Sequence, residues 1–437
     1  MTRRIVVLVI VCTTVMTVAR PASAQDLSQI LGNLTSIQLA PTPPGSGFPS
    51  HSAHFLPAAV PGVNDIPGIF NQQMVQQLST VPLGSSSGGF SFMINPSVGT
   101  VDRTTDSFGP MFAERAYTNG KGRLTIGATY QYSKYNSFEG TSLDSGDLKF
   151  YLRHQNIGSF VQGDLLEEDL KMHLTSSTTS LFVNYGVSDR WDVAIAVPIQ
   201  HVSMDATVNA TILRLSTGAN SPIHQFTNGT NQATFNQAGS ATGIGDITLR
   251  TKYRFLATPG GGLAAGLDVR LPTGDKNNLL GAGATQTTVT LIGSTTTNWN
   301  YFTPHFNVGF TGSHPESGAV VNVANEFGYR VGGEFVLRPT VTLLADLVGR
   351  SLINSGRLTY TDTSYPYQVG SNTAPYQTIP LHEFTPSTGT LNLTSLALGG
   401  KFNVAGNLLV TGSVLVSLTS TGLTARVTPV VGFDYSF

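Results

Sequence analysis

The carboxy-terminal stretch Thr424 to Phe437 reads TARVTPVVGFDYSF, and its side chains alternate in polarity. One set of alternate positions is apolar or aromatic and ends at Phe437, whereas the other set is mostly polar or small and holds both charges, Arg426 and Asp434. A period of two residues predicts a β-strand with a different solvent on each face. A soluble sheet can show this pattern, but aromatic residues gathered at the strand end are typical of a membrane barrel.

The composition excludes several broad classes of protein. Charged residues make up 11% of the chain, against about 25% in a typical soluble domain. Hydrophobic residues make up only 40%, which is too few for a bundle of membrane-spanning helices. Glycine, threonine, serine and asparagine fill the difference, and this mixture suits strands that surround a polar lumen.

Residues 1–24 have the order of a secretory signal peptide. A basic start is followed by the apolar run 5–19 and by the possible cleavage site Ala22-Ser23-Ala24, so we expect cleavage near Ala24. An uncleaved anchor helix is the alternative, although this apolar run is shorter than the ~20 residues that a span needs. We therefore expect a secreted protein.

The cysteine and charge content of the mature chain are equally informative. The only cysteine, Cys12, lies in the leader, so the mature chain has neither a disulfide nor thiol chemistry. Removing the leader's three arginines from 24 basic residues leaves 21 against 25 acidic ones, a net charge of −4. This balance does not indicate a nucleic-acid partner.

Residues 25–87 differ from the rest of the mature chain. They contain eight prolines and no lysine or arginine. Proline cannot donate to a β-ladder, so this segment is not predicted to be barrel wall. A short helix is predicted around Ile69 to Leu78. The segment is either a flexible periplasmic tail or a plug that folds into the barrel.

The remaining residues predict an all-β protein, a transmembrane antiparallel up-and-down β-barrel over 122–437. Residues 88–121 hold two short candidate strands, Phe90–Gly99 and Phe108–Ala116, that lead into it. About twelve wall strands are predicted, and counting the two short candidates would give fourteen. The predicted wall strands are 123–135, a strand ending near 187, 191–199, 243–255, 263–271, 284–296, 302–310, 321–337, 341–347, 396–404, 408–418 and 424–437.

The connections agree with an even strand number, because bacterial barrels have short periplasmic turns and longer outer loops. Counting back from a periplasmic carboxy terminus, the turns fall near residues 189, 260, 298, 339 and 406, and every one is short. The predicted outer loops are mostly long and comprise 136–170, 214–242, 272–283, 314–320, 354–392 and 419–423.

Charged side chains in the wall strands fall on the face opposite the apolar stripe. The stripe itself has one clear polar exception, Asn325. A charge facing lipid at the bilayer midplane costs about 2–4 kcal/mol for Arg or Lys, so this face is predicted to line the lumen. The set either forms a mildly cationic constriction or a salt-bridge network that fills a narrow barrel. Its members are Arg123, Asp192, Asp246, Arg250, Lys252, Arg254, Asp268, Arg270, Glu326, Arg330, Glu334, Arg338, Asp346, Arg350, Lys401, Arg426 and Asp434.

Four stretches carry a resemblance to a known family. They are SSSGGFSFMINPSVGTVDRTTDSFGPMFAERA at 85–116, GVSDRWDVAIAVPI at 186–199, GIGDITLRTKYRFL at 243–256 and GLDVRLPTGDKNNLLGAG at 266–283. They resemble a family of bacterial outer-membrane β-barrel transporters linked to the meta-pathway of phenol degradation. The similarity covers roughly 79–437 and leaves out 25–78. It implies an outer-membrane location and transport, and it implies no particular substrate.

Other motifs carry no catalytic chemistry. The stretch Gly274-Asp275 to Gly281 lacks the Gly-Lys-Ser/Thr tail of a P-loop, so we predict a compact turn capped by Asp275. The nine histidines show no metal-binding pair, and His305 is the one predicted to point into the lumen. Six carboxylates in the first outer loop either bind Ca²⁺ or bridge lipopolysaccharide, or they are solvated loop charge; they are Asp144, Asp147, Asp164, Glu167, Glu168 and Asp169.

The sequence therefore predicts a non-enzymatic outer-membrane channel for small, hydrophobic or aromatic molecules, working by gated passive diffusion. The alternative is a closed structural barrel that binds a ligand or lipopolysaccharide without transport. We expect no cofactor, no metal and no catalytic residue. The expected partners are outer-membrane lipid, lipopolysaccharide, a small solute, and the outer-membrane assembly machinery, which recognises a carboxy-terminal strand ending on an aromatic residue.

Overall fold

The computed structural model describes residues 26–34, 39–40, 66–79, 84–85, 89–90, 92–94, 101–103 and 106–437, with gaps at 155–162, 218–223, 259, 297–300, 316–322 and 372. The predicted leader lies outside these ranges, as do the proline-rich residues 41–65 and residues 316–320 of the predicted outer loop 314–320.

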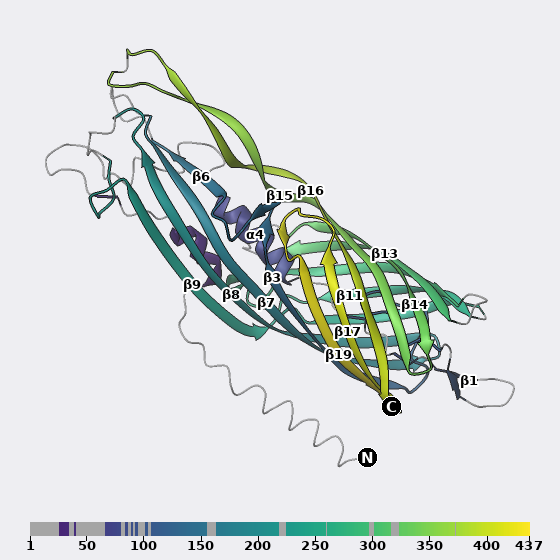
Figure 1. The fold of residues 1–437 in the computed structure, drawn as a ribbon. Coiled ribbons are helices and arrows are strands. Elements are labelled where there is room, and N and C mark those ends of the chain that lie inside the picture. The colour runs from purple at the N-terminus through teal and green to yellow at the C-terminus, as the bar shows by residue number, and fades with distance from the viewer. Residues whose placement is uncertain are drawn as a thin grey trace.

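Twelve antiparallel strands close into a barrel, which confirms the predicted fold class (Figure 1). The last strand pairs with the first, so that Val431 lies opposite Tyr130 and Phe433 opposite Ala128. The wall strands are β3 (Leu124–Tyr135), β7 (Leu165–Ser188), β8 (Trp191–Leu213), β10 (Thr248–Thr258), β11 (Gly261–Arg270), β12 (Ala284–Thr295), β13 (Phe302–Pro315), β14 (Asn325–Arg338), β15 (Val341–Tyr367), β16 (Gln377–Ala405), β17 (Leu408–Ser417) and β19 (Val427–Ser436).

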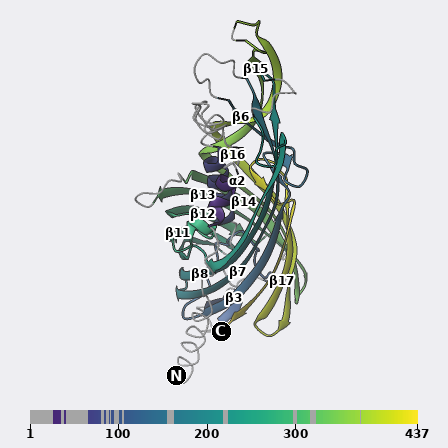
Figure 2. The same ribbon diagram turned by 90° about the vertical axis from the view of Figure 1, so that its left-hand side faces the viewer.

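The two ends of the barrel differ. The end that carries the carboxy terminus has only the short connections predicted near 189, 260, 298, 339 and 406, and we call it the turn end. At the opposite mouth end, β15 and β16 continue as a long hairpin beyond the barrel (Figures 1 and 2). Beside the hairpin, β7 and β8 also continue beyond the barrel at the mouth end. There β7 pairs with β6 (Leu148–Arg153), and β8 pairs with β9 (Gln232–Ile244).

Three predicted outer loops therefore contain strands, and 354–392 is mostly strand. The loops expected at 136–170, 214–242 and 354–392 contain β6, β9 and the β15–β16 hairpin. The predicted strand 243–255 is divided, because residues 245–247 leave the ladder between β9 and β10. The Asp246 carboxylate accepts there from the backbone N–H groups of Gly274 at 2.9 Å and Ala282 at 2.7 Å, which draws the chain toward that turn.

The turn capped by Asp275 is confirmed. Its side chain accepts from the Asn277 N–H at the start of a 3₁₀ helix, η4 (Lys276–Asn278). A small sheet of β4 (Ser137–Phe138), β5 (Thr141–Ser142) and β18 (Leu423–Thr424) lies at the mouth end.

The segment before the barrel contains short helices and one hairpin. The helix predicted around Ile69 is present as α4 (Ile66–Ser79), after η1 (Leu27–Gln29) and α2 (Ile30–Leu34). Strands β1 (Phe92–Ile94) and β2 (Val101–Arg103) pair with each other. The candidate strand Phe108–Ala116 is wrong, because these residues form an irregular, buried segment whose hydrogen bonds go to wall side chains. The wall thus has twelve strands, and neither short candidate joins it.

The outer surface of the barrel carries the predicted apolar stripe. Large hydrophobic side chains such as Leu181, Val331 and Phe433 are exposed along it. Polar side chains of the same strands, including Thr178, Thr248 and Thr342, are buried on the inner face. This arrangement suits a barrel in the outer membrane, with lipid outside and a polar lumen inside.

Candidate functional site: the barrel lumen

Most of the charged side chains predicted to line the lumen lie on the inner face. Eight are buried, namely Asp192, Asp246, Lys252, Arg254, Glu334, Asp346, Lys401 and Asp434. Another seven are half-buried, namely Arg123, Arg250, Asp268, Arg270, Glu326, Arg330 and Arg350. Two are exposed at strand ends, namely Arg338 and Arg426.

Arg338 departs from the prediction for a local reason. A register shift between Val336 and Arg338 pairs Arg338 with Val341, so the simple alternation of β14 ends before this residue. Arg426 precedes the first residue of β19, and its backbone N–H donates to the Asn136 side chain. These two arginines are not part of the charge cluster described below.

Residues 106–121, which we call the inner segment, cross the lumen at the turn end. Many of their side chains are fully buried, including Arg115 and Tyr117. Hydrogen bonds tie the inner segment to eight of the twelve wall strands through Thr125, Asn184, Asp192, Arg250, Ser294, Asn307, Glu334 and Thr342.

One buried ion cluster forms around Arg115. Its Nη1 lies 3.6 Å from Glu334 Oε2, and that carboxylate also accepts from the Gly109 N–H at 2.9 Å. His305 bridges the wall side of the cluster, with Nδ1 3.5 Å from Glu334 and Nε2 2.6 Å from Asp346. Buried charges need such compensation, because an uncompensated charge would be costly inside the barrel.

A second ion cluster forms around Glu114. Its carboxylate lies 2.7 Å from Arg250 Nη1 and 3.6 Å from Lys252 Nζ. Arg250 is held from the other side by Asp268 through two hydrogen bonds of 2.8 Å. Lys252 in turn lies 3.8 Å from Asp192, which accepts from the Asn119 N–H. The inner segment thus contributes a carboxylate to a cluster of wall cations.

The mouth end of the lumen is filled by apolar side chains, in contrast to the charged turn end. A large cluster of buried apolar side chains joins α2 and α4 to the upper parts of β7 and β8. Phe70 of α4 stacks on Phe138 with ring centroids 4.0 Å apart. The polar side chains of α4 reach backbone groups, since Gln73 donates to Gly356 O at 2.8 Å and Gln76 to Ala324 O at 3.1 Å.

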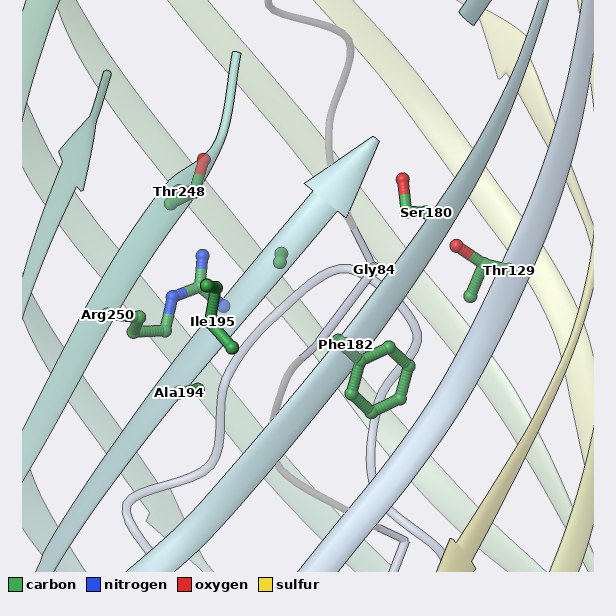
Figure 3. Close-up of a pocket in the computed structure, with 9 residues that line it drawn as sticks. Gly84, Thr129, Ser180, Phe182, Ala194, Ile195, Thr248 and Arg250 are labelled. Atoms are coloured by element: carbon green, nitrogen blue, oxygen red, sulfur yellow. The ribbon is translucent and has the colours of Figure 1, made fainter. Parts of the chain in front are cut away.

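Cavities remain between the inner segment at the turn end and the apolar cluster at the mouth end. One of about 90 Å³ lies above the inner segment, between Phe112 and the inner faces of β10 to β15. Another of about 120 Å³ lies beside Gln77 and shares Val348 and Arg350 with the first. A third space lies near Gly84 and Phe182 (Figure 3). Its volume is about 10 Å³, which is room for about one water molecule.

The predicted outer-loop carboxylates do not converge on one point. Asp144 pairs with Lys134 and His173, whereas Glu167 and Asp169 pair with Lys149. Within the described residues, no three histidine, cysteine, aspartate or glutamate side chains come together as metal ligands. No helix in the described ranges is long and apolar enough to span a membrane.

Asp164 has a separate set of partners. It accepts from His224 Nδ1 at 2.5 Å, from Thr217 Oγ1 at 2.8 Å and from the Ser216 N–H at 2.9 Å. Burial alone would raise the pKa of the Asp164 carboxyl, but the hydrogen bonds from His224 and Thr217 outweigh it and lower that pKa below its ordinary value.

The sequence prediction missed the lumen residues contributed by the inner segment, namely Glu114, Arg115 and Asn119. The available signal was the pair of opposite charges in FAERA, inside an otherwise apolar stretch. The sequence predicts a short strand here, outside the wall, so its charges fall outside the predicted lumen set.

A sequence model of the family described as "Putative MetA-pathway of phenol degradation" matches residues 173–347, which confirms the family resemblance. A search of curated proteins finds no match. Among solved structures, an outer-membrane channel from Pseudomonas putida F1 is 13% identical, with a TM-score of 0.43, covering 74% of this chain and 98% of its own. The toluene transporter of Ralstonia pickettii is 13% identical, with a TM-score of 0.30, covering 83% and 99%. A FadL homologue from Pseudomonas aeruginosa is 12% identical, with a TM-score of 0.31, covering 72% and 89%.

Proposed function

We propose that this protein is an outer-membrane channel that passes small hydrophobic or aromatic molecules by gated passive diffusion. The predicted plug segment 25–87 would act together with the inner segment 106–121 as its plug, and 122–437 as its wall. The single observation that carries this proposal is that the chain's own amino-terminal part occupies both ends of the lumen through non-covalent contacts, with cavities between. The carboxy-terminal strand would be recognised by the outer-membrane assembly machinery.

The dimensions of the barrel support a gated path. Eight-stranded barrels are filled by their own side chains, whereas barrels of 16–18 strands hold open channels. A twelve-stranded barrel lies between these cases, and here backbone as well as side chains occupies the interior. Displacement of the inner segment would exchange its hydrogen bonds for bonds to water. Each such bond contributes only about 0.5–3 kcal/mol net, so the segment can be held firmly and still be released.

The apolar mouth supports the choice of solute. Ligand sites that take hydrophobic molecules are lined mainly by apolar and aromatic side chains. Displacement of α2 and α4 would expose the buried cluster around Phe70, Phe138 and Leu174 as such a lining, at the end that faces outward if the carboxy terminus is periplasmic. A solute would leave water there before it meets the polar inner segment.

A reversible covalent lock tests the gate directly, because the mature chain has no cysteine. Ser107 Oγ of the inner segment lies 3.5 Å from Thr303 Oγ1 of β13, so Ser107→Cys with Thr303→Cys places two thiols within reach. The matched control is Thr361→Cys with Thr385→Cys, whose hydroxyls are 3.1 Å apart on the β15–β16 hairpin.

We expect bilayer conductance and liposome swelling from the reduced lock variant, loss of both on oxidation, and recovery on reduction. The control variant should conduct equally in both states. Equal flux through the oxidised and reduced lock would refute gating by the inner segment. Silence of the wild type and of both reduced variants would refute transport and favour a closed barrel that binds lipopolysaccharide or another ligand.

A further inference from the structure

The cavity of about 90 Å³ in the middle of the lumen is unusually rich in arginine. Its lining includes four arginines and three carboxylates, namely Arg250, Arg270, Arg330, Arg350, Glu114, Asp268 and Glu326. Guanidinium groups stay charged in any protein environment. The lining therefore carries one net positive charge, inside a barrel where charge must be compensated.

The three carboxylates form salt bridges with only two of these four arginines. Arg250 pairs with Asp268 at 2.8 Å and with Glu114 at 2.7 Å. Arg350 pairs with Glu326 at 3.3 Å. Arg270 donates to the neutral amide oxygen of Gln286, at 3.3 Å, and to no carboxylate among the described residues.

Arg330 is the least satisfied of the four. Its Nε is buried and has no hydrogen-bond partner among the described residues. Within the described part of the chain, no carboxylate lies within salt-bridge distance of either Arg270 or Arg330. A buried donor without a partner costs about 1–3 kcal/mol, and more when it is charged, so an incoming acceptor would be favoured here.

The neighbouring cavity of about 120 Å³ supplies an apolar compartment. It shares Val348 and Arg350 with the cationic cavity and is also lined by Leu393, Leu415 and Leu423. A ligand spanning both would place a charged group beside arginine and a hydrophobic body beside leucine. A cavity of ~150 Å³ holds a benzene ring, so the two spaces together suit a one-ring molecule.

We propose that these two cavities form a binding site for a small organic monocarboxylate with an aromatic body. The carboxylate accepts from Arg330 and Arg270, since a planar guanidinium matches a carboxylate through paired hydrogen bonds. A single negative charge neutralises the single excess positive charge of the lining, whereas a phosphate dianion would exceed it. This inference rests on the proposed function, because it names the class of solute that the channel selects.

Equilibrium dialysis of the purified full-length mature protein in detergent tests the site, with benzoate as the probe and benzamide as its uncharged counterpart. Long equilibration allows for slow entry into the filled lumen. We expect saturable binding of benzoate, at least tenfold weaker in Arg330→Gln and in Arg270→Gln. Benzamide should bind the wild type at least tenfold more weakly than benzoate. Arg338→Gln is the matched control, because Arg338 is exposed outside the lumen, and it should bind benzoate as the wild type does.

Three results would overturn the proposal: no saturable benzoate binding, equal binding of benzamide and benzoate, or unchanged benzoate affinity in folded Arg330→Gln. The comparison of the two probes uses the wild type alone, so it stands even if a variant fails to fold. Because dialysis measures binding without flux, the site can be established in a protein that fails the conductance test. Conversely, a channel that conducts but ignores benzoate loses only the inferred solute class.

Discussion

A comparison of the two halves of β7 shows how one strand serves two environments. Toward the turn end, Leu181, Val183 and Tyr185 are exposed outside, while Ser176, Thr178, Ser180 and Asn184 are buried inside. Toward the mouth end, the polarity is reversed on both faces. Lys171 and His173 are exposed outside, whereas Leu166, Leu170, Met172 and Leu174 are buried inside.

We infer from the reversal that the strand leaves the bilayer near residues 175–177. Below this level the wall is a membrane barrel, with an apolar outer face and a polar lumen. Above it, the sheet follows the rule of a soluble sheet, with an inner face that is apolar except for the buried Glu168. The amino-terminal part of the chain has the same polarity as the inner face that it contacts. Apolar helices fill the mouth end, and the charged inner segment fills the turn end.

The largest effect is expected in the polar half, from Arg115→Ala. This change leaves Glu334 buried without its guanidinium partner, and breaking a buried pair in this way costs about 3–5 kcal/mol. We expect the inner segment to detach, with faster hydrogen exchange across 106–121 and higher basal conductance. Lys121→Ala is the control, because Lys121 lies on the same segment and is exposed. Exchange rates as slow as those of the wild type would show that the cluster does not hold the segment.

In the apolar half, the next large effect is expected from Phe70→Ala. Phe70 is almost fully buried and stacks on Phe138, and truncating such a side chain costs about 3–5 kcal/mol. Limited proteolysis should then cut within α4, while the hydrogen exchange of 106–121 stays unchanged. Simultaneous loosening of both regions would contradict the view that the two fillings are separate units.

The structure at the turn end was predicted better from the sequence than the structure at the mouth end, for a physical reason. Twelve wall strands, their pairing order and the short turns follow from a lipid-facing stripe that repeats on every strand. Above the bilayer, β7, β8, β15 and β16 continue without that stripe, so their extensions were assigned to loops. The reversed alternation of 165–174 was present in the sequence, but it did not match the template used for the wall.

The candidate site was predictable only in part. Alternation alone predicted one common face for the seventeen charged side chains, of which eight are buried and seven half-buried. The bulge beside Arg338 could not be predicted from the two-residue period. The pairing of Arg250 with both Glu114 and Asp268 depends on where the inner segment lies in three dimensions. Contacts between such distant parts of the chain leave no local pattern, so the sequence alone could not distinguish a charge network from a constriction.

The boundary on β7 can be tested by placing one charge on each side of it. Val183→Arg puts a guanidinium in the lipid-facing stripe, which costs about 2–4 kcal/mol near the midplane. Thr175→Arg lies on the same face of the same strand, at the proposed edge of the bilayer, and should cost less than about 1 kcal/mol. Urea unfolding of the two variants in lipid vesicles measures the difference. Equal losses of stability would place the boundary elsewhere.

The smallest effect is expected at the mouth end, from Asp164→Asn. The variant loses a charged acceptor for His224, Thr217 and Ser216, and hydrogen bonds to a charged group contribute about 1.5 kcal/mol or more. Because the pKa of Asp164 is lowered in the folded protein, its contribution is full above the unfolded value of about 3.9 and is lost as the pH falls through the folded value.

Hydrogen exchange at residues 214–217, corrected for intrinsic rates, should therefore differ between wild type and Asp164→Asn at neutral pH and converge in strong acid. Asp362→Asn is the control, because Asp362 also pairs with a histidine, His382, but is exposed to solvent, where such a pair contributes little. A difference that persists unchanged below the folded pKa would mean that Asp164 acts through its shape rather than its charge. The mouth would then depend on apolar packing alone, in contrast to the charge-held turn end.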